Sequence, residues 1–161
     1  GYSPEELELV QIKVTEGETL TVVSDYSNDP MSSVSVDYTI TLPADITVSV
    51  QNITGNVSVD GITFVDVLSL VTGDIEVTHC ERVSEIQSTT GSIEVEIEQT
   101  EGDVTIRTTT GNITAWVDPE VNAGLYPSVV TGSYSGPNYT PYGNYRINLS
   151  VVTGNITVYN L

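Results

Sequence analysis

Apolar and polar residues alternate along most of this chain, and the alternation restarts after recurring glycines. The recurring unit is Gly, a small polar or acidic residue, Ile or Val, any residue, and a second apolar residue. Because the two apolar positions lie two residues apart, each unit predicts a turn followed by a half-buried strand. Six copies begin at Gly55, Gly73, Gly91, Gly102, Gly111 and Gly154, and Gly132 begins a degraded seventh.

The spacing of the glycines indicates how the strands are arranged. Gly55, Gly73 and Gly91 follow one another at intervals of 18 residues. Two short strands and two turns close one coil over about that length, at roughly 3.3 Å per strand residue. We therefore predict a β-solenoid whose stacked coils bury a ladder of Ile and Val, with a β-sandwich as the alternative.

The segments around the repeats extend this pattern into a single all-β domain. An antiparallel strand pair at residues 7–14 and 19–24 is expected to form an N-terminal cap. A further alternating strand runs from Val34 to Leu42, where Pro43 ends it. The expected parts of the domain 1–161 are N-terminal strands (1–43), repeat strands (44–117), a Pro- and Tyr-rich insertion outside the strand stack (118–144) and a final repeat (145–161).

Several of these segments carry a family resemblance. The motifs Leu42-Pro43, Thr54-Gly55-Asn56-Val57 and Thr72-Gly73-Asp74-Ile75, with the closing segment 145–158, resemble the adhesin family of the DUF4097 type. The resemblance spans residues 34–158. It implies an extracytoplasmic, repeat-built β domain, and it brings no catalytic residues with it. The insertion and the strong acidity depart from the family's usual pattern.

The strongly negative net charge of the chain argues against anionic partners. The chain has 22 Asp and Glu against Lys13, Arg82, Arg107 and Arg146, which gives a formal charge of −18. Nucleic acid and anionic membrane surfaces would be repelled. No run of apolar residues is long enough for a membrane span. The chain begins at Gly1 without a leader segment, and we expect a mature or trimmed form.

One turn could hold a hard cation. Asp25, Asn28 and Asp29 gather side-chain oxygens of the kind that Ca²⁺ prefers. The competing interpretation is an ordinary turn in which these side chains bond to their own backbone. No other cofactor is expected.

Six asparagines begin Asn-x-Ser/Thr triplets, and this number predicts glycan acceptors on an exported protein. Strand alternation is the competing explanation, because Asn and Thr two residues apart point outward together. The triplets begin at Asn52, Asn56, Asn112, Asn138, Asn148 and Asn155.

No catalytic group stands out. His79 is the only histidine, and its neighbour Cys80 would point to the opposite face of a strand, so neither a triad nor a shared metal is expected. Cys80 is expected to be a small buried residue. The many carboxylates follow the outward positions of the repeats, so we expect a solvated acidic face rather than a hydrolase.

Tyrosines concentrate in the insertion and could form a binding surface or cover one end of the stack. We therefore predict a non-enzymatic, adhesin-like structural protein that is extracellular or on the cell surface. The alternatives are a subunit of a self-assembling filament or surface array, pairing through Leu7–Val14 or Ile156–Leu161, and a carbohydrate- or Ca²⁺-dependent binding module. The partner would be a second copy or a cell-surface glycan. The tyrosines are Tyr126, Tyr134, Tyr139, Tyr142 and Tyr145.

Overall fold

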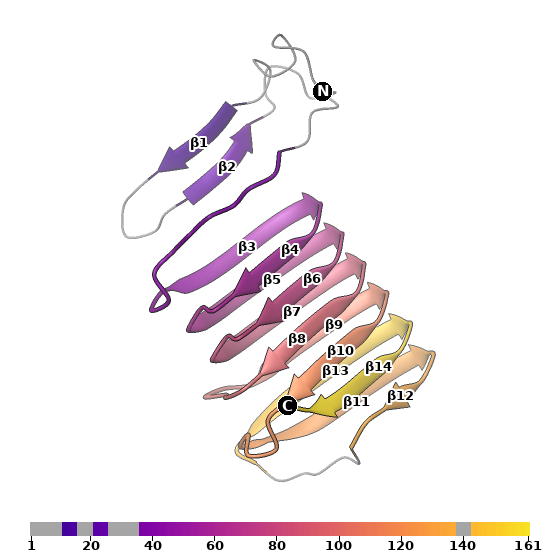
Figure 1. The fold of residues 1–161 in the computed structure, drawn as a ribbon. Helices are drawn as coiled ribbons and strands as arrows, with labels where there is room; N and C mark the ends of the chain where they lie inside the picture. The colour runs from indigo at the N-terminus through magenta and orange to yellow at the C-terminus, as the bar shows by residue number, and fades with distance from the viewer. Residues whose placement is uncertain (1–10, 16–20, 26–35, 138–142) are drawn as a thin grey trace. The chain divides into compact units, whose positions relative to one another are not determined.

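The computed structural model describes residues 11–15, 21–25, 36–137 and 143–161 (Figure 1). All regular structure in these residues is strand, which confirms the all-β prediction. None of the described residues belongs to a helix that is long and apolar enough to cross a bilayer. The chain divides into two compact units, Gly1–Thr41 and Leu42–Leu161.

The first unit contains an antiparallel strand pair, as predicted. Strand β1 (Gln11–Thr15) pairs with β2 (Thr21–Asp25). The alternation after Val34 predicted a further strand, but residues 36–42 form none. Tyr38 and Ile40 are 44% and 49% exposed. Alternation makes a strand possible, but the strand forms only where a neighbouring backbone satisfies its hydrogen bonds.

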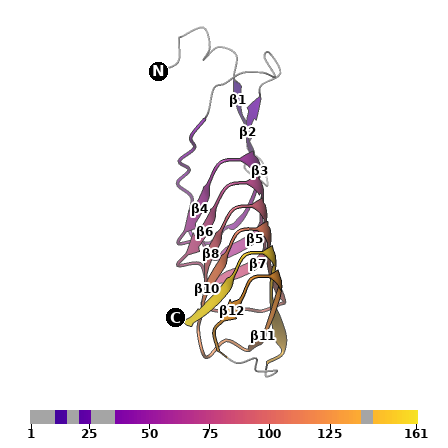
Figure 2. The same cartoon turned by 90° about the vertical axis from the view of Figure 1, so that its right-hand side faces the viewer.

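The second unit is a β-solenoid in which each coil contributes one long and one short strand. The long strands form one parallel six-stranded sheet and the short strands form another (Figure 2). Parallel pairing confirms the solenoid and excludes the sandwich, whose sheets are antiparallel. The long strands are β3 (Thr47–Thr54), β5 (Phe64–Thr72), β7 (Arg82–Thr90), β9 (Val104–Thr110), β11 (Ala123–Thr131) and β13 (Tyr145–Thr153), and the short ones are β4 (Val57–Asp60), β6 (Ile75–Thr78), β8 (Ile93–Ile97), β10 (Ile113–Val117), β12 (Tyr134–Ser135) and β14 (Ile156–Asn160).

The coils do not stack in sequence order. The long-strand sheet has the order β11-β13-β9-β7-β5-β3, and the short-strand sheet has the matching order β12-β14-β10-β8-β6-β4. The last coil of the sequence, β13–β14, therefore lies between β9–β10 and β11–β12. The end of the stack is formed by residues from the Pro- and Tyr-rich segment.

This arrangement corrects the expectation that residues 118–144 leave the stack. Nine of them form β11, which pairs in register with β13 from Ala123 opposite Tyr145 to Thr131 opposite Thr153. Pro127 is accommodated because β11 is an edge strand, where a missing backbone N–H costs little. The degraded repeat at Gly132 is a genuine turn and leads into β12.

Apolar side chains from both sheets fill the space between them. Along the short strands, Ile75, Ile93, Ile113 and Ile156 stand in register and are at most 1% exposed. The predicted Ile and Val ladder is therefore confirmed. Each buried side chain of this size contributes about 1.5–3 kcal/mol relative to exposure.

A ladder of Thr and Gly marks the corner between long and short strands. The glycines have positive φ, for example 145° at Gly91. A Cβ on Gly91 would lie 2.0 Å from the carbonyl oxygen of Gly73 in the next coil, so a side chain is excluded by space as well as by φ. The Thr ladder that precedes the glycines consists of Thr54, Thr72, Thr90, Thr110, Thr153 and Thr131.

A half-buried strand follows Gly102, as predicted, but Gly102 lies at a different corner from the ladder glycines. It precedes the long strand β9 rather than a short one, its φ is not positive, and nothing lies within 4 Å of a Cβ built on it. The residue before it is Glu101, whereas Thr precedes every glycine of the ladder. The five-residue pattern alone does not specify which corner of the coil a glycine occupies.

The polar residue after each ladder glycine joins one coil to the next. Its side-chain oxygen accepts a hydrogen bond from the backbone N–H of the equivalent residue in the neighbouring coil. These bonds satisfy turn amides that no strand could satisfy. The pairs, acceptor first, are Asn56 with Asp74 (3.0 Å), Asp74 with Ser92 (2.7 Å), Ser92 with Asn112 (3.4 Å), Asn112 with Asn155 (2.9 Å) and Asn155 with Ser133 (3.0 Å).

Candidate functional site

His79 lies at the second corner of the solenoid and takes part in an exposed polar cluster. Its Nδ1 is 2.7 Å from Oδ1 of Asp60, and its backbone N–H donates to Oε2 of Glu96 at 2.9 Å. The hydrogen bond to Asp60 raises the pKa of His79, and the negative charge of Glu96 adds to this shift. The same hydrogen bond lowers the pKa of Asp60. Oγ1 of Thr78 donates to the same Oδ1 of Asp60 at 3.1 Å, and the cluster ties one corner of neighbouring coils together.

Cys80 points away from His79 into the core, as predicted. Its side chain is fully buried, and Sγ lies 3.2 Å from the carbonyl oxygen of Thr78. Burial raises the pKa of the thiol, so the reactive thiolate is disfavoured. Among the described residues, no group of three or more His, Cys, Asp and Glu side chains is arranged to hold a metal ion.

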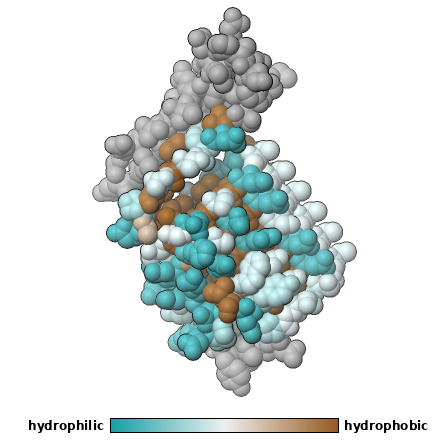
Figure 3. All heavy atoms as spheres, in the orientation of Figure 1, coloured by the Kyte–Doolittle hydropathy of each residue, from teal (hydrophilic) through white to brown (hydrophobic). Residues whose placement is uncertain are grey.

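The outer face of the short-strand sheet is acidic over β6 and β8. Glu76 and Glu94 stand directly opposite each other on β6 and β8, and both are exposed. Figure 3 views this face and shows hydrophilic residues spread across it, with hydrophobic residues visible only in patches between them. The exposed carboxylates occupy the outward positions of the strands, where the repeat pattern placed them.

Two tyrosines of the predicted surface, Tyr126 and Tyr134, lie on different sheets. Tyr126 is on the long strand β11, with the guanidinium of Arg146 3.8 Å from its ring centre. Tyr134 is on the short strand β12, packs against the core and donates its hydroxyl hydrogen to the carbonyl oxygen of Pro137 at 2.6 Å. Tyr145 begins β13 and is half-buried, whereas Tyr139 and Tyr142 lie outside the described residues. Burial raises the pKa of Tyr134.

Sequence reasoning missed an aromatic pair on the short-strand sheet. Trp116 of β10 and Tyr159 of β14 stand in register and stack with ring centres 5.8 Å apart. Each lies five residues after its repeat glycine, Gly111 or Gly154. Aligning the repeats on their glycines places the two rings at equivalent positions, and they meet because β14 pairs with β10.

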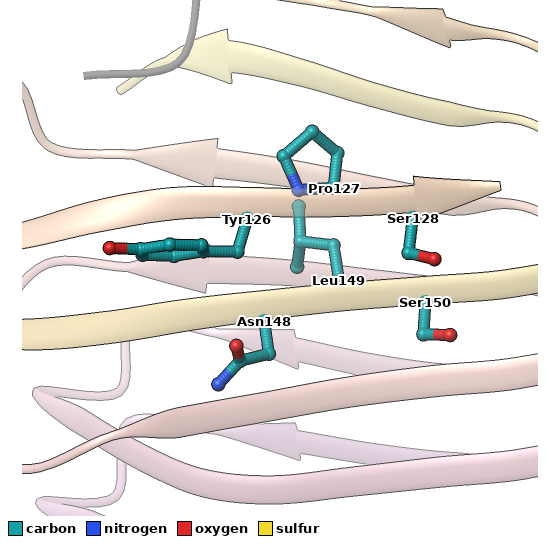
Figure 4. A pocket seen from close by; sticks show the side chains of 6 residues that line it. All are labelled: Tyr126, Pro127, Ser128, Asn148, Leu149 and Ser150. Atoms are coloured by element: carbon teal, nitrogen blue, oxygen red, sulfur yellow. The ribbon is translucent and has the colours of Figure 1, made fainter. Parts of the chain in front are cut away.

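A shallow hollow of about 470 Å³ lies over β11 and β13 on the long-strand sheet. Figure 4 shows Tyr126 and Ser128 leaving one side of β11, with Pro127 on the other side. Asn148 and Ser150 occupy the matching positions of β13, in register with Tyr126 and Ser128. Leu149 completes the lining. The hollow thus combines one aromatic ring with hydroxyl and amide groups, and none of its six lining residues carries a charge.

The predicted glycan acceptors are spread over the solenoid. Asn56, Asn112 and Asn155 belong to the polar ladder and are exposed, and Asn52 is exposed near the end of β3. Asn148 is half-buried and donates from Nδ2 to the carbonyl oxygen of Val104 at 3.3 Å. Asn138 lies outside the described residues.

The proposed cation turn is largely outside the described residues. Asp25 is the last residue of β2, and its side chain is not described, while Asn28 and Asp29 are not described at all. The calcium site stays a prediction.

Comparisons with known proteins identify a family and a solved structure of similar fold. The family model described as Toastrack DUF4097 matches residues 6–158. The fold is similar to a crystal structure from Clostridium sporogenes ATCC 15579 that bears the name "putative cell adhesion protein", with a TM-score of 0.56 and 13% sequence identity. That match covers 94% of this chain and 76% of the other. No curated protein matches the sequence.

Proposed function

Because the chain belongs to the Toastrack DUF4097 family, we propose that it is a non-enzymatic structural protein of the cell surface with an adhesin-like role. The name of the Clostridium protein with a similar fold supports a surface role, although at 13% identity the likeness itself concerns the fold. The proposal therefore depends on what the residues of this chain do.

The observation that carries the proposal is the role of the repeated residues. Thr, Gly and the polar residue after Gly form ladders that cross all six coils, and the apolar residues that follow fill the core. Solenoids of this kind are stable through contacts between neighbouring coils. The repeated residues thus serve to stack the coils, which suits a protein whose task is to hold a surface in place.

The outward residues fit an exposed position. The acidic face favours solubility and opposes non-specific association with anionic surfaces. Glycans on the exposed ladder asparagines would extend from the corner of the coils without entering the core. We propose the extracellular or cell-surface location and the glycan acceptors on this basis.

A self-assembling filament is less well supported than a single surface module. Strand β14, a predicted pairing edge, lies between β10 and β12 rather than at the end of its sheet. The strands that end the long-strand sheet are β11 and β3, and at the β11 end Pro127 removes one backbone donor. Proline on an edge strand opposes pairing with another chain.

The experiment is adhesion by cells from which the gene has been deleted. Deletion should reduce attachment to the surface that the parent cells colonise. Wild-type protein and a Gly102→Ala variant should restore attachment, whereas Gly91→Ala should not, because only Gly91 is in the stacking ladder. Unchanged attachment after deletion would contradict the adhesive role.

A further inference from the structure

The two halves of the solenoid differ sharply in charge. Residues 42–103, which form β3 to β8, contain twelve Asp and Glu and one Arg. Residues 104–161, which form β9 to β14, contain two acidic residues and two arginines, and are therefore neutral overall. Since β9–β10, β13–β14 and β11–β12 are adjacent in the stack, this neutral half is one continuous part of the solenoid.

Aromatic residues follow the same division. The acidic half has Phe64 as its single aromatic residue, and the neutral half has seven. Solubility explains the acidic half, but it does not explain why carboxylates stop where aromatic rings begin. Exposed or half-exposed aromatic rings are enriched where proteins bind ligands and partners.

The hollow over β11 and β13 lies in this neutral half. Tyr126 provides an aromatic face, and Arg146 holds the ring in position from 3.8 Å. The hydroxyls of Ser128 and Ser150 are exposed and make no hydrogen bond to any described residue. Asn148 uses one donor of its amide on Val104. The polar groups are thus placed on a strand pair whose register is fixed by backbone bonds, which reduces the entropy lost on binding.

These groups match the chemistry of a sugar. A pyranose presents an apolar C–H face, which packs on an aromatic ring, and hydroxyl groups, which exchange hydrogen bonds with Ser and Asn side chains. The volume of about 470 Å³ is within the range of small-molecule sites.

We propose that the hollow formed by Tyr126, Ser128, Asn148 and Ser150 binds a neutral saccharide. The ligand is neutral because the six lining residues carry no charge and residues 104–161, which supply them, are neutral overall. This site rests on the proposed surface role and gives it a partner. The neutral half is then the recognition end of the solenoid, and the acidic half is its solvated support.

The test is a titration of the full 161-residue chain with defined sugars, followed by amide NMR or calorimetry. The probes are cellotetraose, chitotetraose and lactose as neutral sugars, with 3′-sialyllactose as the anionic comparison. We expect one or more neutral probes to bind, with shifts confined to β11 and β13. Tyr126→Ala should weaken that binding about ten-fold, by analogy with the loss of one aromatic stacking contact.

Two further variants separate binding from folding. Ser128→Trp fills the hollow without removing Tyr126 or Arg146, and it should also abolish binding. Tyr159→Ala removes an exposed aromatic residue from the other sheet and should leave binding unchanged.

Absence of binding by all neutral probes, equal binding by Tyr126→Ala, or stronger binding of 3′-sialyllactose would overturn the proposal. Because cell attachment is measured separately, failure of every neutral probe to bind would refute the saccharide site, while attachment that still depends on the gene would leave the surface role intact.

Discussion

Alanine at three glycines separates the two reasons why the stacking corner requires glycine. Gly102 has neither positive φ nor a neighbour near its Cβ position, so Gly102→Ala should change stability little, or raise it by about 0.4–1 kcal/mol through the unfolded chain. Gly55 has a φ of 124° but its nearest atom, Nδ2 of Asn52, is 3.4 Å from a Cβ. Gly55→Ala should therefore lower the free energy of unfolding by about 1–3 kcal/mol through backbone strain alone.

Gly91→Ala adds a collision to the same strain. Its Cβ would lie 2.0 Å from a backbone oxygen that cannot rotate away, so neighbouring coils must separate. Overpacking costs typically 1–3 kcal/mol, and with the strain the loss is roughly 2–6 kcal/mol. Since domains are stable by about 5–15 kcal/mol, this variant should be severely destabilised or unfolded.

The assay is denaturation by urea, followed by the fluorescence of Trp116, which is the single tryptophan and stacks on Tyr159 within the solenoid. The predicted order of stability is Gly102→Ala, then Gly55→Ala, then Gly91→Ala. A Gly91→Ala variant as stable as Gly102→Ala would refute the stacked-glycine corner. Equal losses at Gly55 and Gly91 would instead assign the whole effect to φ.

Three other predictions concern the ladder, the corner cluster and the order of coils. Asn112→Ala should cost about 0.5–1.5 kcal/mol and speed hydrogen exchange of the amide it caps, whereas Asn112→Asp keeps the acceptor and most of the stability. His79 should titrate above about 6.5 by NMR, and Asp60→Asn should lower its pKa. Because the pKa of His79 is raised in the folded protein, its protonated form stabilises the fold fully below about pH 6.5, and this stabilisation is lost as pH rises through the folded pKa. A stabilisation that grows with pH over that range would contradict the raised pKa. Deleting residues 145–161 should remove the hydrogen-exchange protection of β11 and β12 while β3 to β8 keep theirs, because β11 and β12 pair with no strands except β13 and β14. Protection of β11 in the truncated chain would show that it can stack directly on β9.

The sequence predicts the elements of the fold better than their order. Gly, Thr and period-2 apolar residues are local signals, and they correctly predicted the turns, the half-buried strands and the Ile ladder. The same signals cannot tell one coil from another, because any Thr-Gly corner can stack on any other. The insertion of β13–β14 inside the stack was therefore not predictable from the pattern, and neither was the corner that Gly102 occupies.

The binding residues were less predictable. The tyrosines were grouped because they are close in sequence, but β11 and β12 belong to different sheets, so Tyr126 and Tyr134 face different surroundings. The hollow instead joins Tyr126 to Asn148 and Ser150, about twenty residues away, through strand register. That register depends on which coils are neighbours, and this information is absent from a local repeat.

The proposed surface role is tested most directly by labelling intact cells that naturally produce the protein with an antibody against the folded solenoid. The account predicts labelling of intact cells, lost when the gene is deleted. Labelling that appears only after the cells are permeabilised would contradict it.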